Sequence, residues 1–263
     1  MLSIHFTGAL ARKLLNKFAD HFSGHADEYA RYRPDYPAEL FRWLAKTSPA
    51  TGLAWDCATG NGQAALGLAD HFQQIIATDA SEKQIEKAVP HDRVSYRVAP
   101  AEDSGLDANC VDLITVAQAL HWFDLDAFYR EATRVLKTGG VLAIWSYGLA
   151  TIQVDVDALI RHLYQDIVGP YWPMERRLVE TGYSELAFPF REIEAPAFSM
   201  HINWSLEELT GYLRTWSAVK RFIQDKGEDP VTMIEAELGK AWGNIDAKVQ
   251  IYWPLNMRVG ING

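Results

Sequence analysis

The chain has 263 residues, a formal net charge of −9, and 48% apolar and 22% charged residues. This composition excludes a disordered chain, and an acidic balance with scattered lysines and arginines argues against a nucleic-acid partner. No apolar stretch reaches the roughly 18 residues that span a bilayer, so we expect no membrane association. Two cysteines without a pairing pattern favour a reducing compartment, and we predict a cytoplasmic protein.

The first twenty residues are basic, with Arg12, Lys13 and Lys17 and no acid before Asp20. A targeting segment is one interpretation, but the stretch lacks a solid apolar run and an obvious cleavage site. A short amphipathic helix is the favoured interpretation, because apolar residues recur there at helical spacing.

Between residues 53 and 147, short apolar runs alternate with helical patterns, which predicts parallel strands joined by crossovers. The predicted strands are Leu53–Cys57, 74–78, 94–99, Val111–Ala117 and 141–145. Several lack polar alternation, as expected for strands that are buried on both faces. We expect a loop or one short helix at residues 101–110.

Two connecting helices carry local signals. Ser81 and Gln84 have the spacing of a capping box, which predicts a helix beginning after Ser81. An apolar stripe that starts at Phe128 and ends at Leu136 predicts the helix before the fifth strand. We expect the glycines in residues 137–140 to end that helix and lead into the strand.

The rhythm changes after Tyr147. Residues 150–185 and 205–245 are predicted to be helical, the second with a capping box at Ser205, and residues 188–203 and 248–259 are each predicted to form a strand. We therefore predict a doubly wound α/β fold. It has a mostly parallel, Rossmann-like sheet of seven strands, the last antiparallel, and a small helical cap.

The most informative segment is the turn at residues 58–63, between the first strand and the first helix of the sheet. Gly60 and Gly62 permit a close approach that side chains would forbid, and a ligand over the turn can receive backbone N–H bonds. Asp79 ends the second strand, where its carboxylate can accept bonds from two ribose hydroxyls. Together these features predict an adenosine-type ligand, although the glycine pair alone also fits the dinucleotide fingerprint.

Several blocks of the sequence resemble the class I S-adenosylmethionine-dependent methyltransferases, in the type 11 small-molecule branch that includes the trans-aconitate methyltransferases. The resemblance covers most of residues 22–147 and continues more faintly to the end. The matching blocks are a lid segment at 29–34, the glycine turn at 56–63, the ribose-binding Asp79, an adenine segment at 101–103, a methionine segment at 117–123, and a turn at 136–140.

The resemblance implies S-adenosylmethionine as the cofactor, with S-adenosylhomocysteine as the product. Arg33 could pair with the methionine carboxylate, since a guanidinium fork matches two carboxylate oxygens, or it could support the turn at Pro34. The implied cofactor-binding residues are Tyr29, Arg33, Asp56, Ala58, Thr59, Gly60, Asn61, Gly62, Gln63, Asp79, Ala80, Ser81, Ala101, Glu102, Ala117 and Gln118. Ala58 replaces the family's first glycine and Thr138 its usual proline, but neither change removes a ligand-contacting side chain.

The acceptor site is less sharply specified. His121 is the candidate catalytic and substrate-binding residue at the methyl-transfer site, as a general base; a hydrogen-bonding wall and a structural histidine are the alternatives. Trp122 and Trp172 are candidate substrate-binding residues that could equally pack in the core, and Arg176 could receive an acidic acceptor or belong to a solvated helix face. The dispersed histidines show no ligand spacing, so we predict no metal.

These observations predict an enzyme that transfers a methyl group from S-adenosylmethionine to a small-molecule acceptor, with an organic acid as one candidate. The alternatives are an NAD-linked oxidoreductase and a non-catalytic S-adenosylmethionine-binding module. We expect residues 1–35 to form an N-terminal lid, 36–147 the cofactor-binding core, and 148–263 the rest of the sheet with the helical cap. The sequence does not indicate the oligomeric state.

Overall fold

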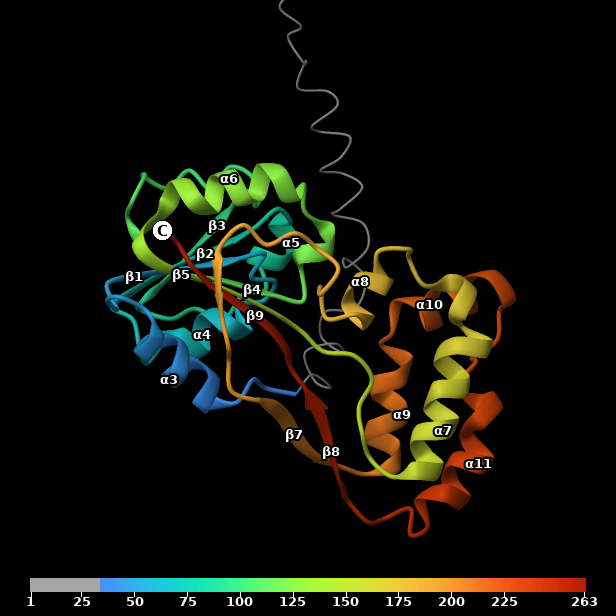
Figure 1. Cartoon of the computed structure of the whole chain (residues 1–263). Coiled ribbons are helices and arrows are strands. Elements are labelled where there is room, and N and C mark those ends of the chain that lie inside the picture. Colours follow the sequence, from blue (N-terminus) through green and yellow to red (C-terminus); the bar gives the residue numbers. More distant parts are fainter. Residues whose placement is uncertain (1–33) are drawn as a thin grey trace, which may run out of the picture.

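A seven-stranded sheet organises residues 34–263, the part of the chain that this computed structural model describes (Figure 1). The strand order is β3-β2-β1-β4-β5-β9-β6, and β1 to β5 run parallel, whereas β9 runs antiparallel to both β5 and β6. The strands are β1 (Leu53–Cys57), β2 (Gln74–Asp79), β3 (Val94–Val98), β4 (Val111–Ala117), β5 (Leu136–Ser146), β6 (Arg191–Ile193) and β9 (Asn256–Ile261). The predicted doubly wound sheet with an antiparallel last strand is confirmed.

Helices cover both faces of the sheet, which explains why its central strands are apolar throughout. On one face, α3 (Ala38–Thr47) and α4 (Gln63–Ala69) pack on residues such as Leu113; on the other, α6 (Leu125–Val135) packs on residues such as Ile114 (Figure 1). Both side chains are fully buried. A hydrophobic core on each face of the sheet therefore fixes the positions of the carboxyl ends of the parallel strands.

Two local predictions differ from the structure. α5 (Glu82–Ile85) is a single turn without a capping box, because Ser81 makes no side-chain cap and instead donates its backbone N–H to Asp79 Oδ1. α6 ends at Val135, and β5 begins at the next residue, so residues 137–140 belong to the strand rather than to a helix stop. There Gly139 has φ +76° and donates its N–H to the carbonyl of Asn262, which a glycine at this angle permits.

A helical cap stands beside the sheet (Figure 1). Its helices are α7 (Val154–His162), the π-helical η2 (Leu163–Ile167), the 3-10 turn η3 (Gly169–Tyr171), α8 (Arg176–Glu180), α9 (Leu206–Arg214), α10 (Ser217–Lys226) and α11 (Thr232–Trp242). The predicted capping box that opens α9 is confirmed, with Ser205 Oγ accepting from Glu208 N and Glu208 Oε2 accepting from Ser205 N.

Each of the two predicted C-terminal strands is divided in two. β7 (Ser199–Trp204) and β8 (Val249–Pro254) form a separate antiparallel pair that leads to the cap, while β6 and β9 belong to the main sheet. Leu255 separates β8 from β9, and its N–H donates to the carbonyl of Phe198 at the point where both segments change sheets. In the described part of the chain, none of the helices has the length and apolar character needed to cross a bilayer.

Candidate functional site

The glycine turn between β1 and α4 is built from left-handed backbone. Ala58, Gly60 and Gly62 have φ of +54°, +58° and +92°, and Thr59 N donates to the carbonyl of Thr78 at 2.9 Å, which fixes the turn beside β2. No atom of residues 34–263, apart from the neighbouring residues of the turn itself, lies within 4 Å of the place where a Cβ on Gly60 would stand. The described part of the chain therefore leaves the backbone of Gly60 open to a ligand group.

Asp79 lies against this turn. Its Oδ2 accepts the N–H of Gly60 at 2.9 Å and its Oδ1 accepts the N–H of Ser81 at 2.8 Å. Burial raises the pKa of Asp79, and these two N–H bonds counteract the rise. Each carboxylate oxygen can accept about two bonds, so the side chain keeps capacity for hydroxyl donors beside Gly60. The fold therefore places the Asp79 carboxylate beside the glycine turn, as the sequence predicts.

Asp56 differs from its expected role as a ligand contact. It is 1% exposed, and its two oxygens accept the hydroxyls of Thr59 at 2.5 Å and Thr115 at 2.6 Å. Burial raises its pKa to about 6, against the opposing effect of hydrogen bonds from these threonines and from Ala65 N. Asp56 therefore stabilises the turn through Thr59 and the start of α4 through Ala65 N.

Other predicted cofactor residues line the same edge of the sheet. Gln63 Nε2 donates to the carbonyl of Pro34 at 2.8 Å and to Asp35 at 3.0 Å, which ties the chain before α3 to the glycine turn. Half-buried positions at the turn and after β2 are Asn61, Ala80 and Ser81. Tyr29 and Arg33 lie outside the described residues.

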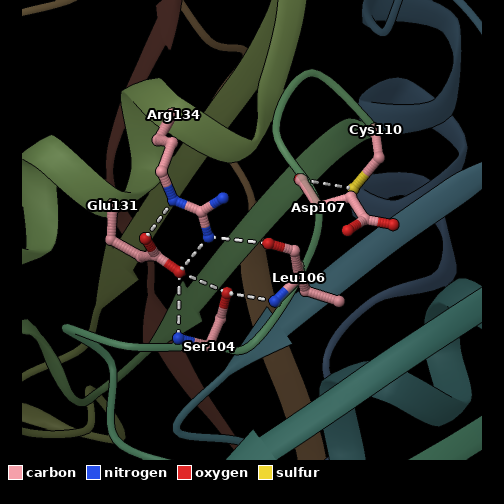
Figure 2. A network of polar contacts seen from close by, with 6 residues as sticks. All are labelled: Ser104, Leu106, Asp107, Cys110, Glu131 and Arg134. Atoms are coloured by element: carbon pink, nitrogen blue, oxygen red, sulfur yellow. Dashed lines mark hydrogen bonds and ion pairs between the residues drawn. The ribbon is translucent and has the colours of Figure 1, made fainter.

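The loop after β3 is held by α6, as Figure 2 shows. Glu131 Oε1 accepts the N–H and the hydroxyl of Ser104 at 2.9 and 2.5 Å, and both of its oxygens bind Arg134. Arg134 also donates to the carbonyl of Leu106 at 2.7 Å. At the other end of the helix, Glu102 Oε1 accepts the N–H of Asp124. This anchoring fixes the segment that contains Ala101, which is buried, and Glu102.

The segment after β4 forms a second wall. Ala117 and Gln118 are half-buried, and Gln118 adopts φ +58° while its Nε2 donates to the carbonyl of Tyr147 at 2.9 Å. The 3-10 helix η1 (Leu120–Trp122) follows, and in it His121 Nδ1 lies 2.9 Å from the hydroxyl of Tyr183. Burial, assisted by the positive charge of Arg176, lowers the pKa of His121 to about 3, so the ring is neutral.

Arg176 is held among aromatic rings at the start of α8. Its Nε donates to the hydroxyl of Tyr164 at 2.8 Å, and that hydroxyl donates to Glu180. Its guanidinium carbon lies 4.9 Å from the ring centroid of Trp172 and 5.6 Å from that of Tyr164. Within residues 34–263, no carboxylate forms a direct ion pair with Arg176. The structure thus brings His121, Trp122 and Arg176 to one region, with Trp172 behind the guanidinium.

Sequence reasoning missed the two tyrosines of this region. Tyr164 and Tyr183 belong to no spacing motif, and Tyr183 is 62 positions from the histidine that it contacts. A tyrosine following a glycine in a polar stretch was the only local signal. Among the described residues, no group of three or more His, Cys, Asp or Glu side chains gathers as metal ligands would.

The residues at the carboxyl edge suit S-adenosylmethionine. Residues 34–263 leave the Cα of Gly60 uncovered, so an adenosyl group could approach the backbone there, and the Asp79 carboxylate beside it has acceptor capacity for ribose hydroxyls. The rings of Trp122 and the neutral His121 pack against each other, and the face of an aromatic ring attracts a cation such as a sulfonium.

Comparisons with known proteins give the family. Residues 55–144 match the family described as "Methyltransferase domain". A Dictyostelium discoideum protein named as a methyltransferase is 35% identical over 248 residues, covering 92% of this chain and 94% of that protein. A Saccharomyces cerevisiae protein named as an S-adenosylmethionine-dependent methyltransferase is 23% identical, covering 77% and 82%. A solved type II methyltransferase structure from Anaeromyxobacter dehalogenans has 46% identity and a TM-score of 0.83, covering 87% of this chain and 97% of that one.

These likenesses extend over nearly the whole chain, and they agree with the glycine turn and its carboxylate. The NAD-linked oxidoreductase alternative is therefore wrong. The protein is an enzyme whose cofactor is S-adenosylmethionine, and the chain belongs to the class I S-adenosylmethionine-dependent methyltransferases.

Proposed function

We propose that the protein transfers a methyl group from S-adenosylmethionine to a small-molecule acceptor that binds between η1 and α8. The observation that carries this proposal is the Asp79 carboxylate held against Gly60 at the end of β2, with His121 in the helical turn that follows the end of β4 in the same parallel sheet. The cofactor supplies an electrophilic methyl group on a sulfonium when it is bound. The residues of the chain bind, orient and exclude water, and such positioning contributes about 7–11 kcal/mol in favourable cases.

The cofactor half of the site divides among three strand ends. We assign the ribose to Asp79, the adenine to the loop at Ala101 and Glu102, and the methionine part to Ala117 and Gln118. Gly60 and its neighbours approach the adenosyl group with backbone alone. The buried Asp56 holds this turn without a contact of its own.

We also propose the N-terminal lid and the division of the chain into a cofactor part and an acceptor part. Gln63 ties Pro34 to the glycine turn, so the chain that precedes residue 34 meets the described part beside the cofactor site. Tyr29 and Arg33 would then bind the cofactor's carboxylate from residues 1–35. The core at 36–147 would hold the cofactor, and residues 148–263 would supply the acceptor side.

The acceptor class that suits Arg176 is an organic acid. Its guanidinium is half-buried against Trp172 and Tyr164 and has no direct carboxylate partner within residues 34–263, so a substrate carboxylate can take that place. The Trp122 ring packs against His121, tilted by 43° with ring centroids 4.7 Å apart, and would line the apolar side of the pocket. We propose a small organic acid as the acceptor.

Calorimetry with S-adenosylhomocysteine tests the cofactor half. Asp79→Asn should weaken binding at least tenfold, because an amide cannot accept from both N–H groups and from the ribose with the same strength. Asp92→Asn is the matched control, since Asp92 is exposed on a loop nearby in sequence. Equal affinity of wild type and Asp79→Asn would contradict the assignment.

A screen with labelled cofactor tests the acceptor half, using organic acids, phenols, amines and a nucleic-acid pool. With the acceptor found, Arg176→Gln should raise the KM for a carboxylate about tenfold, the effect of losing one charge-assisted interaction. Arg177→Gln is the matched control, because the Arg177 side chain is 73% exposed and pairs with Glu185 instead of packing on the aromatic rings. Methylation confined to nucleic acid, or an Arg176→Gln enzyme with unchanged KM for acids, would refute the proposal.

A further inference from the structure

Tyr183 occupies an unusual place in the turn after α8. It is 1% exposed, and it adopts φ +62°, a left-handed backbone that a bulky residue rarely takes. The turn is held on both sides, because Tyr183 N donates to the carbonyl of Leu178 and Arg258 donates to the carbonyl of Tyr183. This strained but anchored backbone places the Tyr183 hydroxyl 2.9 Å from His121 Nδ1.

The proton between these two side chains can be located from their surroundings. Burial raises the pKa of Tyr183, although Arg176 opposes the rise, so the hydroxyl keeps its hydrogen. Within residues 34–263, His121 Nδ1 is the one hydrogen-bond partner of this buried hydroxyl, and a buried hydroxyl hydrogen that found no acceptor would carry a desolvation cost. The hydroxyl hydrogen is therefore left for His121 Nδ1, which must accept it as an unprotonated nitrogen.

A neutral histidine carries one ring proton, so His121 then carries it on Nε2. The imidazole makes one hydrogen bond within residues 34–263, the one to Tyr183, and Nε2 remains for a ligand. We propose that Tyr183 is a positioning residue that fixes His121 as the Nε2–H tautomer, so that His121 donates a hydrogen bond to an acceptor oxygen instead of removing a proton. This inference rests on the proposed acceptor site, and it replaces the general-base role expected from the sequence.

Nitrogen-15 NMR of the ligand-free protein, with labelled histidine at pH 7, tests the tautomer directly. His121 is assigned by the signal that disappears in His121→Gln. The wild-type spectrum should show a protonated Nε2 and an unprotonated Nδ1. Tyr183→Phe, which keeps the ring and removes the hydroxyl, should shift His121 toward a mixture of both tautomers. A wild-type ring protonated at Nδ1 would overturn the inference, and so would an unchanged tautomer in Tyr183→Phe.

The chain offers a matched control at a second tyrosine. Tyr252 stacks on His201 with ring centroids 6.0 Å apart, the same separation as between Tyr183 and His121, but His201 Nε2 binds Ser199 instead. Tyr252→Phe should leave both histidine tautomers unchanged. If it altered His121, the effect of Tyr183→Phe could not be local, and the inference would fail.

An activity measurement separates this inference from the proposed function. With a working acceptor, Tyr183→Phe should lower kcat/KM about tenfold and leave the affinity for S-adenosylhomocysteine unchanged, because the tyrosine acts through His121. The NMR result needs no acceptor, so a failed acceptor screen would count against the proposed function alone. A drop in S-adenosylhomocysteine affinity equal to the drop in kcat/KM would assign Tyr183 a structural role and refute the positioning role.

Discussion

Glu131→Gln is the perturbation that best tests whether α6 positions the loop after β3. Glu131 is 7% exposed, and it contacts no residue assigned to the cofactor. It does hold Ser104, which directly follows the adenine segment at 101–103 (Figure 2). Glutamine preserves the size of the side chain, keeps one oxygen for Ser104, and sets an NH2 group against the N–H donors of Arg134.

The magnitude follows from the three contacts that change. Two bonds from Ser104 become neutral instead of charge-assisted, a loss of about 1 kcal/mol each. The pair with Arg134 contributes at most about 1 kcal/mol, since that side chain is 43% exposed and its charge is screened. Unfolding free energy should therefore fall by about 2–3 kcal/mol. A loop that has lost its anchor should also bind S-adenosylhomocysteine about tenfold more weakly.

The pH dependence has a defined sign. Burial raises the pKa of Glu131, but hydrogen bonds from Arg134 and Ser104 outweigh it, so the net pKa lies below the ordinary value for glutamate. A depressed carboxyl pKa stabilises the fold above the unfolded pKa, and this contribution is lost as the pH falls through the folded value. The stability difference between wild type and Glu131→Gln should therefore shrink at acid pH.

Urea unfolding and calorimetry at several pH values measure both effects. Glu237→Gln is the matched control, because Glu237 is exposed on α11 and its side chain makes no hydrogen bond or ion pair within residues 34–263. If Glu131→Gln lost stability but kept wild-type affinity for S-adenosylhomocysteine, the loop would not depend on α6 for its binding geometry. That outcome would show that the bonds among Glu131, Ser104 and Arg134 stabilise the fold but do not position the loop for cofactor binding.

Three further predictions concern the turn and the cap. Asp56→Asn should gain stability relative to wild type by about 2 kcal/mol between pH 4 and pH 7 in urea unfolding. The pKa of Asp56 is raised from 3.8 to about 6 in the fold, which stabilises wild type below the unfolded pKa, and this stabilisation is lost as the pH rises. A flat difference would show that Asp56 does not ionise in this range. Gly62→Ala should lose more thermal stability than Gly60→Ala. A Cβ on Gly62, which has φ +92°, would collide with the Tyr96 side chain, whereas a Cβ on Gly60 would meet no side chain of residues 34–263; equal losses would contradict the packing. Ser205→Ala should reduce unfolding free energy by about 1 kcal/mol through loss of the capping box, and no change would mean that Glu208 caps α9 alone.

The sheet could be predicted from local patterns up to β5 but not beyond it. Leu53–Cys57 and Val111–Ala117 are continuous apolar runs, and a strand buried on both faces needs no information about its partner. The C-terminal strands are different, because residues 188–203 and 248–259 each read as one extended segment. Where each divides depends on the pairing near Leu255, which no local signal records.

The site shows the same division between local and distant information. Gly60 and Asp79 were predictable because the βαβ topology brings the ends of adjacent parallel strands together. The supporting role of Asp56 was not, since burial and the hydroxyl of Thr115 decide it, and Thr115 lies 59 positions away. Tyr183 was missed for the same reason, because only the folded turn after α8 brings it to His121.

Of the four non-glycine residues with left-handed backbone in residues 34–263, all but Asn109 lie where the proposed ligands bind. Ala58, Gln118 and Tyr183 have φ between +54° and +62°, and each lies in the glycine turn, at the end of β4, or against His121. A non-glycine residue in this region costs about 1–3 kcal/mol, so the surrounding contacts must hold it there. Asp56 and the carbonyl of Tyr147 are such contacts. Because the anchors lie behind the ligand surface, weakening one should relax the strained residue first. Ligand affinity should then fall before the fold as a whole unfolds.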